Sequence, residues 1–218
     1  MTKSIFSPHQ REFIAAFTKS KLANSFYLTG GTALTGFYIP YRYSEDLDFF
    51  SEKEFNLMEI TVFLKAIKNK LGYQKMDINT SFNRNIFQLF INKDILKTEF
   101  TYFPFSQLKK PKLKKGIKVD SILDIAVNKI FTIYQKPRSR DFIDLYMIHQ
   151  NFEFEIDDLT KKAQIKFDWY IDPIKLGSEF LSAKKLKDYP RLIEKIHPIK
   201  WQNFFEKEAK KLKTRIFK

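Results

Sequence analysis

The spacing of apolar residues divides the chain into a part that mixes strands with helices and a part that is helical. Up to about residue 118, short apolar runs bounded by turn residues alternate with helical patterns. Beyond it, apolar residues recur mostly at the three- and four-residue spacing of helices. We therefore predict an α+β core over residues 1–118 and a helical C-terminal region over residues 119–218, which can pack as one unit with the core.

Strands are predicted wherever short apolar or alternating runs end at turn residues. The last two strands form a hairpin that turns at Asn92-Lys93-Asp94. The segment KKPKLKKG, residues 109–116, is predicted to be a basic loop. The predicted strands cover residues 26–29, 46–50, 73–79, 86–91 and 95–104.

Capping residues set the predicted helix boundaries. Ser7-Pro8-His9-Gln10 supplies a serine cap, a proline in the first turn and a glutamine that reaches back to the cap. Ser51 and Glu54 have the spacing of a second capping box. The predicted helices run from 8 to about 20, from about 32, from 51 to about 71, from 121 to about 134 and from 140 to 150, and helical patterns continue from Phe152 to Phe217.

The composition excludes several kinds of site. A chain of 218 residues with 44% hydrophobic residues can bury a substantial core. It contains no cysteine, so disulfides, thiolate zinc sites and cysteine nucleophiles are excluded. Its three histidines, His9, His149 and His197, are far apart in the sequence, which disfavours a histidine metal site or a serine–histidine triad. Metal chemistry would rest on carboxylates, which favour hard ions such as Mg²⁺.

The net charge of +14, from 39 basic and 25 acidic residues, has two interpretations. It can reflect a lysine-rich soluble surface, or it can indicate an anionic partner such as nucleic acid or nucleotide phosphate. The N-terminal sequence lacks the apolar core of a signal peptide, and no window has the roughly 18 apolar residues of a membrane helix. We expect a cytoplasmic protein with no membrane partner.

Two aspartates interrupt the apolar pattern of the strand at 46–50. Residues two apart in a strand point the same way, so Asp46 and Asp48 share one face. Two carboxylates on one face repel each other unless a cation lies between them, and paired metal ions about 4 Å apart are a device of phosphoryl transfer. The alternative is an edge strand with a solvated acidic face.

Two further features bear on a nucleotide site. Gly30-Gly31-Thr32 follows a strand and precedes a helix, which is an arrangement that binds phosphate, although a tight turn explains the glycines equally well. Glu99 lies in a later strand, two residues after Lys97, and can serve as a third metal ligand or as a general base. The alternative for Lys97 and Glu99 is an ordinary surface strand.

Two segments together resemble a known family. LTGGTAL, residues 28–34, with RYSEDLDFF, residues 42–50, resembles the opening motif of the AbiEii/AbiGii-type nucleotidyltransferase toxins, in the DNA polymerase β-like nucleotidyltransferase superfamily. GIKVDSILDIAVNKIFTIYQKPRSRDFIDLYMI, residues 116–148, resembles the second signature of that family. With the Glu99 strand, the resemblance spans about residues 26–150.

The resemblance implies both a fold and a reaction. The fold is a mixed β-sheet flanked by helices, followed by a helical C-terminal part. The reaction is transfer of a nucleoside monophosphate from an NTP to an acceptor, with Mg²⁺ or Mn²⁺. Implied partners are the NTP, an RNA such as the 3′ end of tRNA, and a cognate antitoxin in a toxin–antitoxin or phage-defence pair. Alternatives are a small-molecule or protein-hydroxyl acceptor, or a non-catalytic RNA-binding module.

The resemblance also implies roles for individual residues. Arg42 and Ser44 orient the acidic strand or meet the nucleotide, and Lys129 contacts phosphate unless it is only an exposed helix lysine. Either Asp141 or Asp144 is the acid of the second signature, although Asp144 could simply pair with Arg140. Pro137 stands where the family has a turn of arginine and glycine. The implied catalytic residues are Asp46, Asp48, Glu99, Lys129 and Asp141, the first three also being the metal ligands, and Gly30, Gly31, Thr32, Arg42, Ser44 and Lys129 bind the nucleotide.

Overall fold

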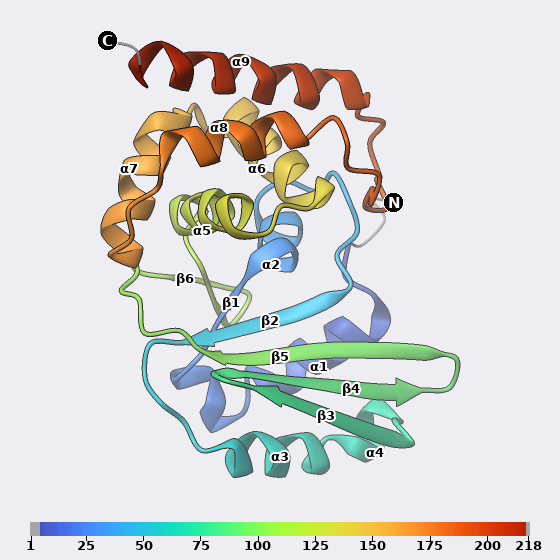
Figure 1. Ribbon diagram of the computed structural model, residues 1–218. Helices are drawn as coiled ribbons and strands as arrows, with labels where there is room; N and C mark the ends of the chain where they lie inside the picture. Colours follow the sequence, from blue (N-terminus) through green and yellow to red (C-terminus); the bar gives the residue numbers. More distant parts are fainter. Residues whose placement is uncertain (1–4, 217–218) are drawn as a thin grey trace. The chain divides into compact units, whose positions relative to one another are not determined.

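The strands of the chain assemble into one mixed sheet. In the computed structural model, which describes residues 5–216, the sheet has seven strands in the order β3-β4-β5-β2-β1-β7-β6 (Figure 1). Strand β1 is parallel to β7, β2 is parallel to β5, and the other neighbours are antiparallel. The strands are β1 (Tyr27–Thr29), β2 (Asp46–Ser51), β3 (Lys75–Ser81), β4 (Arg84–Ile91), β5 (Asp94–Tyr102), β6 (Lys112–Lys114) and β7 (Ile117–Val119).

The first helix begins at the predicted capping box. The Ser7 hydroxyl accepts from the Gln10 amide at 3.1 Å, and the Gln10 side-chain oxygen accepts from the Ser7 amide at 2.9 Å. The Gln10 side chain also donates to the carbonyls of Ser44 and Glu45 at 2.8 and 3.1 Å, so it holds the segment that leads into β2. The helices of this part are α1 (Pro8–Phe17), η1 (Lys21–Asn24), α2 (Gly30–Phe37), α3 (Leu57–Ala66) and α4 (Lys68–Leu71).

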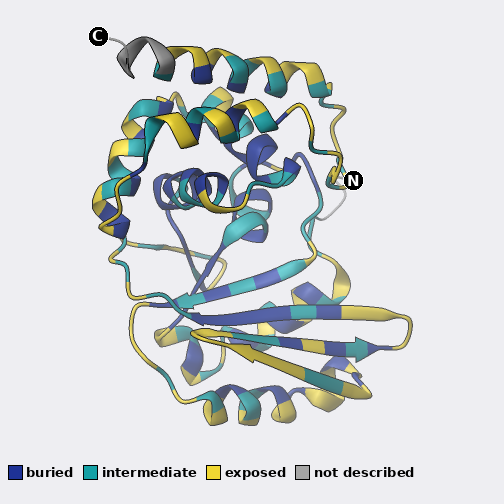
Figure 2. Cartoon of the chain, viewed as in Figure 1, coloured by how far each residue is buried: buried dark blue, intermediate teal, exposed yellow. Residues whose placement is uncertain are grey.

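One face of the sheet is apolar and packs on helices. Along β2, Leu47 and Phe49 are fully buried, whereas Asp46, Asp48 and Phe50, which alternate with them, are partly exposed. The ring centroid of Phe17 in α1 lies 4.3 Å from that of Phe49, and the ring centroid of Phe13 lies 5.9 Å from that of Phe49. Figure 2 shows β5 largely buried and the edge strand β3, on the other side of β4, mostly exposed. The alternation of β2 therefore sends its acidic residues to the opposite, polar face.

Two sequence predictions in this part are wrong. Ser51 does not cap a helix, because its hydroxyl donates to the Lys53 carbonyl in a turn after β2, and α3 begins at Leu57 with Asn56 as its cap. The predicted basic loop contains the hairpin of β6 and β7, which turns at two left-handed residues, Lys115 (φ 50°) and Gly116 (φ 81°). Its three-residue strands are shorter than the usual pattern that identifies a strand.

The second half of the chain is helical, as predicted. The Phe131 ring of α5 stacks on Phe167 of α7 at 4.0 Å, and Phe142 of α6 packs on Phe205 of α9 at 4.7 Å. Phe217, the end of the predicted C-terminal pattern, lies outside the described residues. These helices are α5 (Ile122–Gln135), α6 (Ser139–Phe152), α7 (Ile156–Phe167), α8 (Pro173–Ser182) and α9 (Pro198–Ile216).

The chain forms two compact units. The sheet unit extends to Ser106 and includes Lys110–Ser121, and the helical unit comprises Gln107–Lys109 and the residues from Ile122 onward. The mixed sheet, its flanking helices and the helical C-terminal part confirm the predicted fold class. The division at residue 118 into an α+β core and a helical C-terminal region stays a prediction. Among the described helices, none is both long and apolar enough to cross a bilayer.

Candidate active site

The register of two parallel strands brings the predicted carboxylates to one face. Asp46 of β2 lies opposite Lys97 of β5, and Asp48 lies opposite Glu99. Side chains of directly paired residues point to the same side of a sheet. Asp46, Asp48 and Glu99 therefore share the polar face, which is the arrangement that a joint site requires.

Asp46 is fixed by contacts from two directions. Its side chain accepts from the Lys97 ammonium at 3.2 Å, and both side chains remain partly exposed, 24% for Asp46 and 34% for Lys97. The Thr32 hydroxyl donates to the Asp46 backbone carbonyl. Thr32 is buried, so in this structure its hydroxyl positions β2 beside the start of α2.

Glu99 is held by Arg84, a residue that the sequence analysis did not identify. The Arg84 guanidinium donates to both of its oxygens at 2.7 Å, and the Thr101 hydroxyl donates at 2.7 Å. Burial raises the pKa of Glu99, but the hydrogen bonds from Arg84 and Thr101 outweigh burial and leave the pKa below its usual value. Glu99 is thus a fixed carboxylate, which does not suit a general base.

The predicted glycine turn approaches the polar face closely. Gly30 has a φ of +69°, and a Cβ at this position would lie 2.6 Å from an Asp48 side-chain oxygen. A Cβ at Gly31 would overlap the Arg42 guanidinium and lie 3.0 Å from the Ser44 hydroxyl. The positive φ favours glycine at position 30, and a side chain at position 31 would have to displace the Arg42 guanidinium. The two glycines start helix α2, whose first amides can bind an anion.

Arg42 is a buried cation under this turn. Only 3% of the residue is exposed, and its guanidinium donates to the Tyr43 carbonyl at 2.9 Å and to the Tyr41 hydroxyl at 3.3 Å. Its position beside Gly31 adds positive charge where an anion would meet the start of α2.

The predicted residues of the helical unit form a second, buried cluster. The Lys129 ammonium lies 2.7 Å from an Asp141 oxygen and 2.6 Å from an Asp144 oxygen, and Arg138 lies 2.9 Å from Asp141. Burial raises the pKa of Asp141, but the charges of Lys129 and Arg138 outweigh it and lower the pKa. Lys129 is buried, which removes the alternative of an exposed helix lysine, and both candidate acids contact its ammonium.

A long-range contact to the first turn of α6 supports this cluster. The Ser139 amide and hydroxyl donate to one Asp188 oxygen at 3.1 and 2.8 Å, which fixes the first turn of α6. Asp188 lies almost fifty residues further along the chain, so no local pattern indicates the contact. It steadies the turn after Pro137, where Arg138 and Asp141 meet.

The carboxylates of the polar face are the candidate ligands for a divalent cation. Among the described residues, no group of three or more histidine or acidic side chains has the arrangement of a metal site. Asp46 and Asp48 nevertheless offer hard carboxylate oxygens on one face, which fit Mg²⁺ or Mn²⁺. Glu99 accepts from Arg84 on both oxygens and from Thr101 on Oε1, and the second lone pair of Oε2 is the site at which it could join them.

A comparison with protein families identifies the chain. The family model described as nucleotidyl transferase AbiEii toxin, Type IV toxin–antitoxin system, matches residues 12–214. This chain belongs to the AbiEii family. It is therefore a nucleotidyltransferase, and membership in AbiEii implies an NTP substrate, a divalent metal and an antitoxin partner.

Individual relatives extend the AbiEii comparison. An uncharacterized protein of Aquifex aeolicus (strain VF5) is 29% identical over 163 residues, which cover 72% of this chain and 74% of the relative. The crystal structure of JHP933 from Helicobacter pylori has a TM-score of 0.63 and 22% identity, covering 95% of this chain and 91% of that one. A second H. pylori chain has the same TM-score and identity over 99% and 96%. The two structures share the fold of this AbiEii protein.

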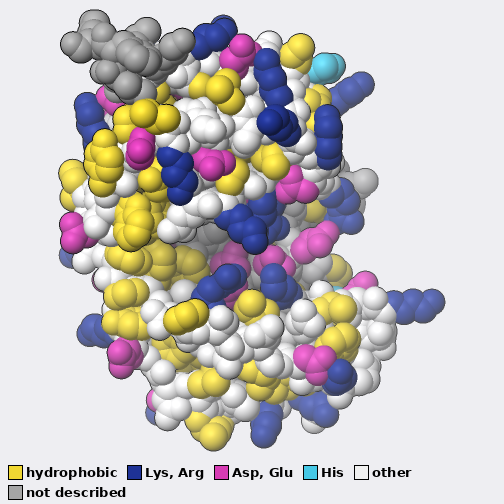
Figure 3. Space-filling model, in the orientation of Figure 1, with side chains coloured by type: hydrophobic (Ala, Val, Ile, Leu, Met, Phe, Trp, Pro, Cys, Tyr) yellow, Lys and Arg dark blue, Asp and Glu magenta, His cyan; other side chains and the backbone are white. Residues whose placement is uncertain are grey.

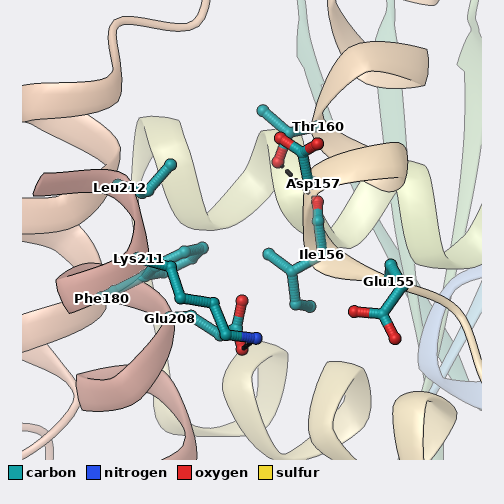
Figure 4. A pocket seen from close by; sticks show the side chains of 8 residues that line it. All are labelled: Glu155, Ile156, Asp157, Thr160, Phe180, Glu208, Lys211 and Leu212. Atoms are coloured by element: carbon teal, nitrogen blue, oxygen red, sulfur yellow. Dashed lines mark hydrogen bonds and ion pairs between the residues drawn. The ribbon is translucent and has the colours of Figure 1, made fainter. Parts of the chain in front are cut away.

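A pocket in the helical unit does not belong to the predicted AbiEii site. Its volume of about 60 Å³ is too small for a nucleotide, since ligand pockets usually exceed about 300 Å³. None of the residues expected to bind the nucleotide lines it. The lining residues, drawn in Figure 4, are Glu155, Ile156, Asp157, Thr160, Phe180, Glu208, Lys211 and Leu212.

Proposed function

We propose that this protein transfers a nucleoside monophosphate from an NTP to the 3′ end of an RNA, with tRNA as the first candidate. It would act in a Mg²⁺-dependent reaction as the toxin of a toxin–antitoxin or phage-defence pair. One observation carries the catalytic part of the proposal. Asp46, Asp48 and Glu99 share the polar face of the sheet, and Asp48 lies against the glycine turn.

The glycine turn would hold the triphosphate. The first amides of α2 have no helical partner of their own, and the positive φ of Gly30 lets the backbone approach an anion closely. Arg42, buried under Gly31, would add charge without touching solvent. Thr32 would keep α2 and β2 in register, since its hydroxyl already binds the Asp46 carbonyl.

Asp46 and Asp48 would hold the divalent cation. Such a cation, when bound, lowers the pKa of an attacking hydroxyl and stabilises charge on the transferring phosphoryl group. Lys97 would have to share or release Asp46 when the cation binds, because its ammonium now contacts an Asp46 side-chain oxygen. Glu99, with a lowered pKa and its oxygens occupied, would supply fixed negative charge and would not accept the proton.

Lys129 would present positive charge to the phosphates. An ammonium has three donors, and Asp141 and Asp144 engage two of them, so one N–H remains for a ligand. Asp141 also binds Arg138, whose side chain is 43% exposed. Asp141 would thus position both Lys129 and Arg138, and Asp144 would position Lys129.

Two features favour an RNA acceptor. The net charge is +14, and the chain carries a lysine-rich hairpin at β6–β7. Enzymes that modify cationic small molecules need acidic acceptor sites, so the positive charge weakens the small-molecule alternative.

The test is a transfer assay with α-labelled nucleotides. Wild-type protein is incubated with total tRNA, Mg²⁺ and each NTP in turn, and we expect RNA to be labelled with at least one NTP and the labelling to stop with EDTA. Asp46→Asn should lose at least about 100-fold in rate. The matched control is Asp77→Asn, which removes an aspartate of the same sheet face that pairs with Lys75 at 2.8 Å. Equal labelling by Asp46→Asn and Asp77→Asn would refute the proposed site.

A further inference from the structure

The β6–β7 hairpin concentrates positive charge at one end of the sheet. Strand β6 is an edge strand, since β7 is its only neighbour in the sheet order of the described residues (Figure 1). Residues 110–118, here called the basic hairpin, contain no acidic residue. Its lysines are Lys110, Lys112, Lys114, Lys115 and Lys118.

The hydrogen-bond acceptors of these lysines are backbone carbonyls. Among the described residues, none of the five forms an ion pair with a carboxylate. Lys114 donates to the Phe37 carbonyl at 3.0 Å, and Lys118 donates to the Asn24 carbonyl at 2.5 Å. Lys112 and Lys115 are exposed. The charge of the basic hairpin is therefore not neutralised by the protein itself.

Several surface lysines of the helical unit do pair with carboxylates. On α7, Lys161 pairs with Asp157 at 3.0 Å and Lys162 pairs with Asp158 at 2.7 Å. On α9, Lys210 pairs with Glu206 at 3.0 Å. In Figure 3, acidic side chains lie among the basic ones over this part of the surface. The charges of Lys161, Lys162 and Lys210 are neutralised locally, so these three lysines contribute less to the attraction of a polyanion.

The hairpin lysines also repel one another. Burial lowers the pKa of Lys114, and the charge of Lys112, two residues away on the same strand, lowers it further. A row of phosphates along the hairpin would relieve this repulsion. An edge strand leaves that side of the hairpin accessible to a partner.

We propose that the basic hairpin is the surface on which the phosphates of the acceptor RNA dock. This inference rests on the proposed function, because it assumes that the acceptor is RNA. It places the binding in the hairpin of the sheet unit and excludes the paired lysines of α7 as a main contributor.

The experiment compares two double variants of the full chain that each remove two charges. Lys112→Gln with Lys115→Gln changes the hairpin, and Lys161→Gln with Lys162→Gln changes α7 as the control. Binding of labelled tRNA is measured between about 50 and 200 mM KCl. Each lost phosphate contact reduces the slope of log affinity against log salt by about one, so the hairpin variant should lose about two. The advantage of wild type over the hairpin variant then shrinks about 16-fold across this range.

The possible outcomes separate this inference from the proposed function. If wild type labels RNA but the two double variants have equal salt slopes, the hairpin proposal is wrong and the RNA acceptor stands. Self-association of the hairpin variant with an unchanged slope would show that the lysines only protect an edge strand, which also overturns the proposal. If wild type transfers nucleotide to another acceptor and labels no RNA, both proposals fall.

Discussion

The two charged clusters of this AbiEii protein differ in how much the fold depends on their ion pairs. Asp46 on the sheet is 24% exposed in its side chain and has a 3.2 Å contact to Lys97. Lys129 in the helical unit lies within 2.7 Å of two carboxylates that are fully buried. The polar sheet face can exchange its partner for a ligand, whereas the buried cluster cannot lose a member without leaving an unpaired charge. Substitutions in the buried cluster should therefore lower the free energy of unfolding more than substitutions on the polar sheet face.

The largest effect is expected at the buried cluster. Lys129→Met leaves Asp141 and Asp144 close together without their cation, which should cost about 3–5 kcal/mol of the free energy of unfolding. Urea unfolding measures the loss. Lys161→Met on the surface of α7 is the control and should change stability by less than about 0.5 kcal/mol. Similar small losses of stability in Lys129→Met and Lys161→Met would contradict the claim that the fold depends on the ion pairs of the buried cluster.

A smaller effect is expected at Arg84, which joins a solvated side chain to a buried carboxylate. Arg84→Met should cost about 1–2 kcal/mol, since Glu99 loses a bidentate partner but Arg84 is 58% exposed in its side chain and screened by solvent. The measurement is the midpoint of urea unfolding at neutral pH. A loss as large as that of Lys129→Met would mean that the fold depends on the ion pairs of the sheet face as strongly as on those of the buried cluster.

The same variant has a defined pH dependence. The folded-state pKa of Glu99 is lowered, so its contribution to stability is complete above its unfolded pKa of about 4.3 and is lost as the pH falls through the folded value. Between about pH 5 and pH 3, wild type should therefore lose more stability than Arg84→Met. Parallel acid profiles for the two proteins would show that Arg84 does not hold the Glu99 carboxylate in the folded state.

The smallest effect on stability is expected at the aspartates of the polar face. Asp46 and Asp48 share one face with Glu99, so removing one charge relieves repulsion and offsets the lost contact. Asp46→Asn and Asp48→Asn should each change the free energy of unfolding by less than about 1 kcal/mol. Thermal unfolding of the two variants beside wild type measures this. A loss of several kcal/mol in the free energy of unfolding would show that the fold depends on the aspartates of β2.

The acidic face could be predicted from the sequence because it depends on local periodicity. The spacing of Asp46 and Asp48 fixes their common face whatever the neighbours of the strand are. The glycine turn was likewise visible as a strand that runs into Gly30 and Gly31. The pairing of Asp48 with Glu99 was not visible, because a parallel register is set by packing far from either residue.

Contacts between distant segments explain why the sequence did not reveal certain residues. Arg84 reaches Glu99 diagonally across the β4–β5 ladder, and only a known hairpin register reveals this. Asp188 accepts hydrogen bonds from Ser139 at the start of α6 and lies in a segment with no strong local pattern. Ser51 is the opposite case. Its spacing to Glu54 matches a capping box, but its hydroxyl donates to the Lys53 carbonyl in the turn after β2 and caps no helix.

The most direct test is to measure transfer and folding on one protein, Asp48→Asn. Its single-turnover rate of nucleotidyl transfer from an α-labelled NTP is compared with wild type, and its free energy of unfolding is measured in the same buffer. We predict a rate at least about 100-fold lower with stability unchanged within about 1 kcal/mol. A transfer rate close to that of wild type, in a protein that is equally stable, would contradict the assignment of the polar sheet face as the site of catalysis.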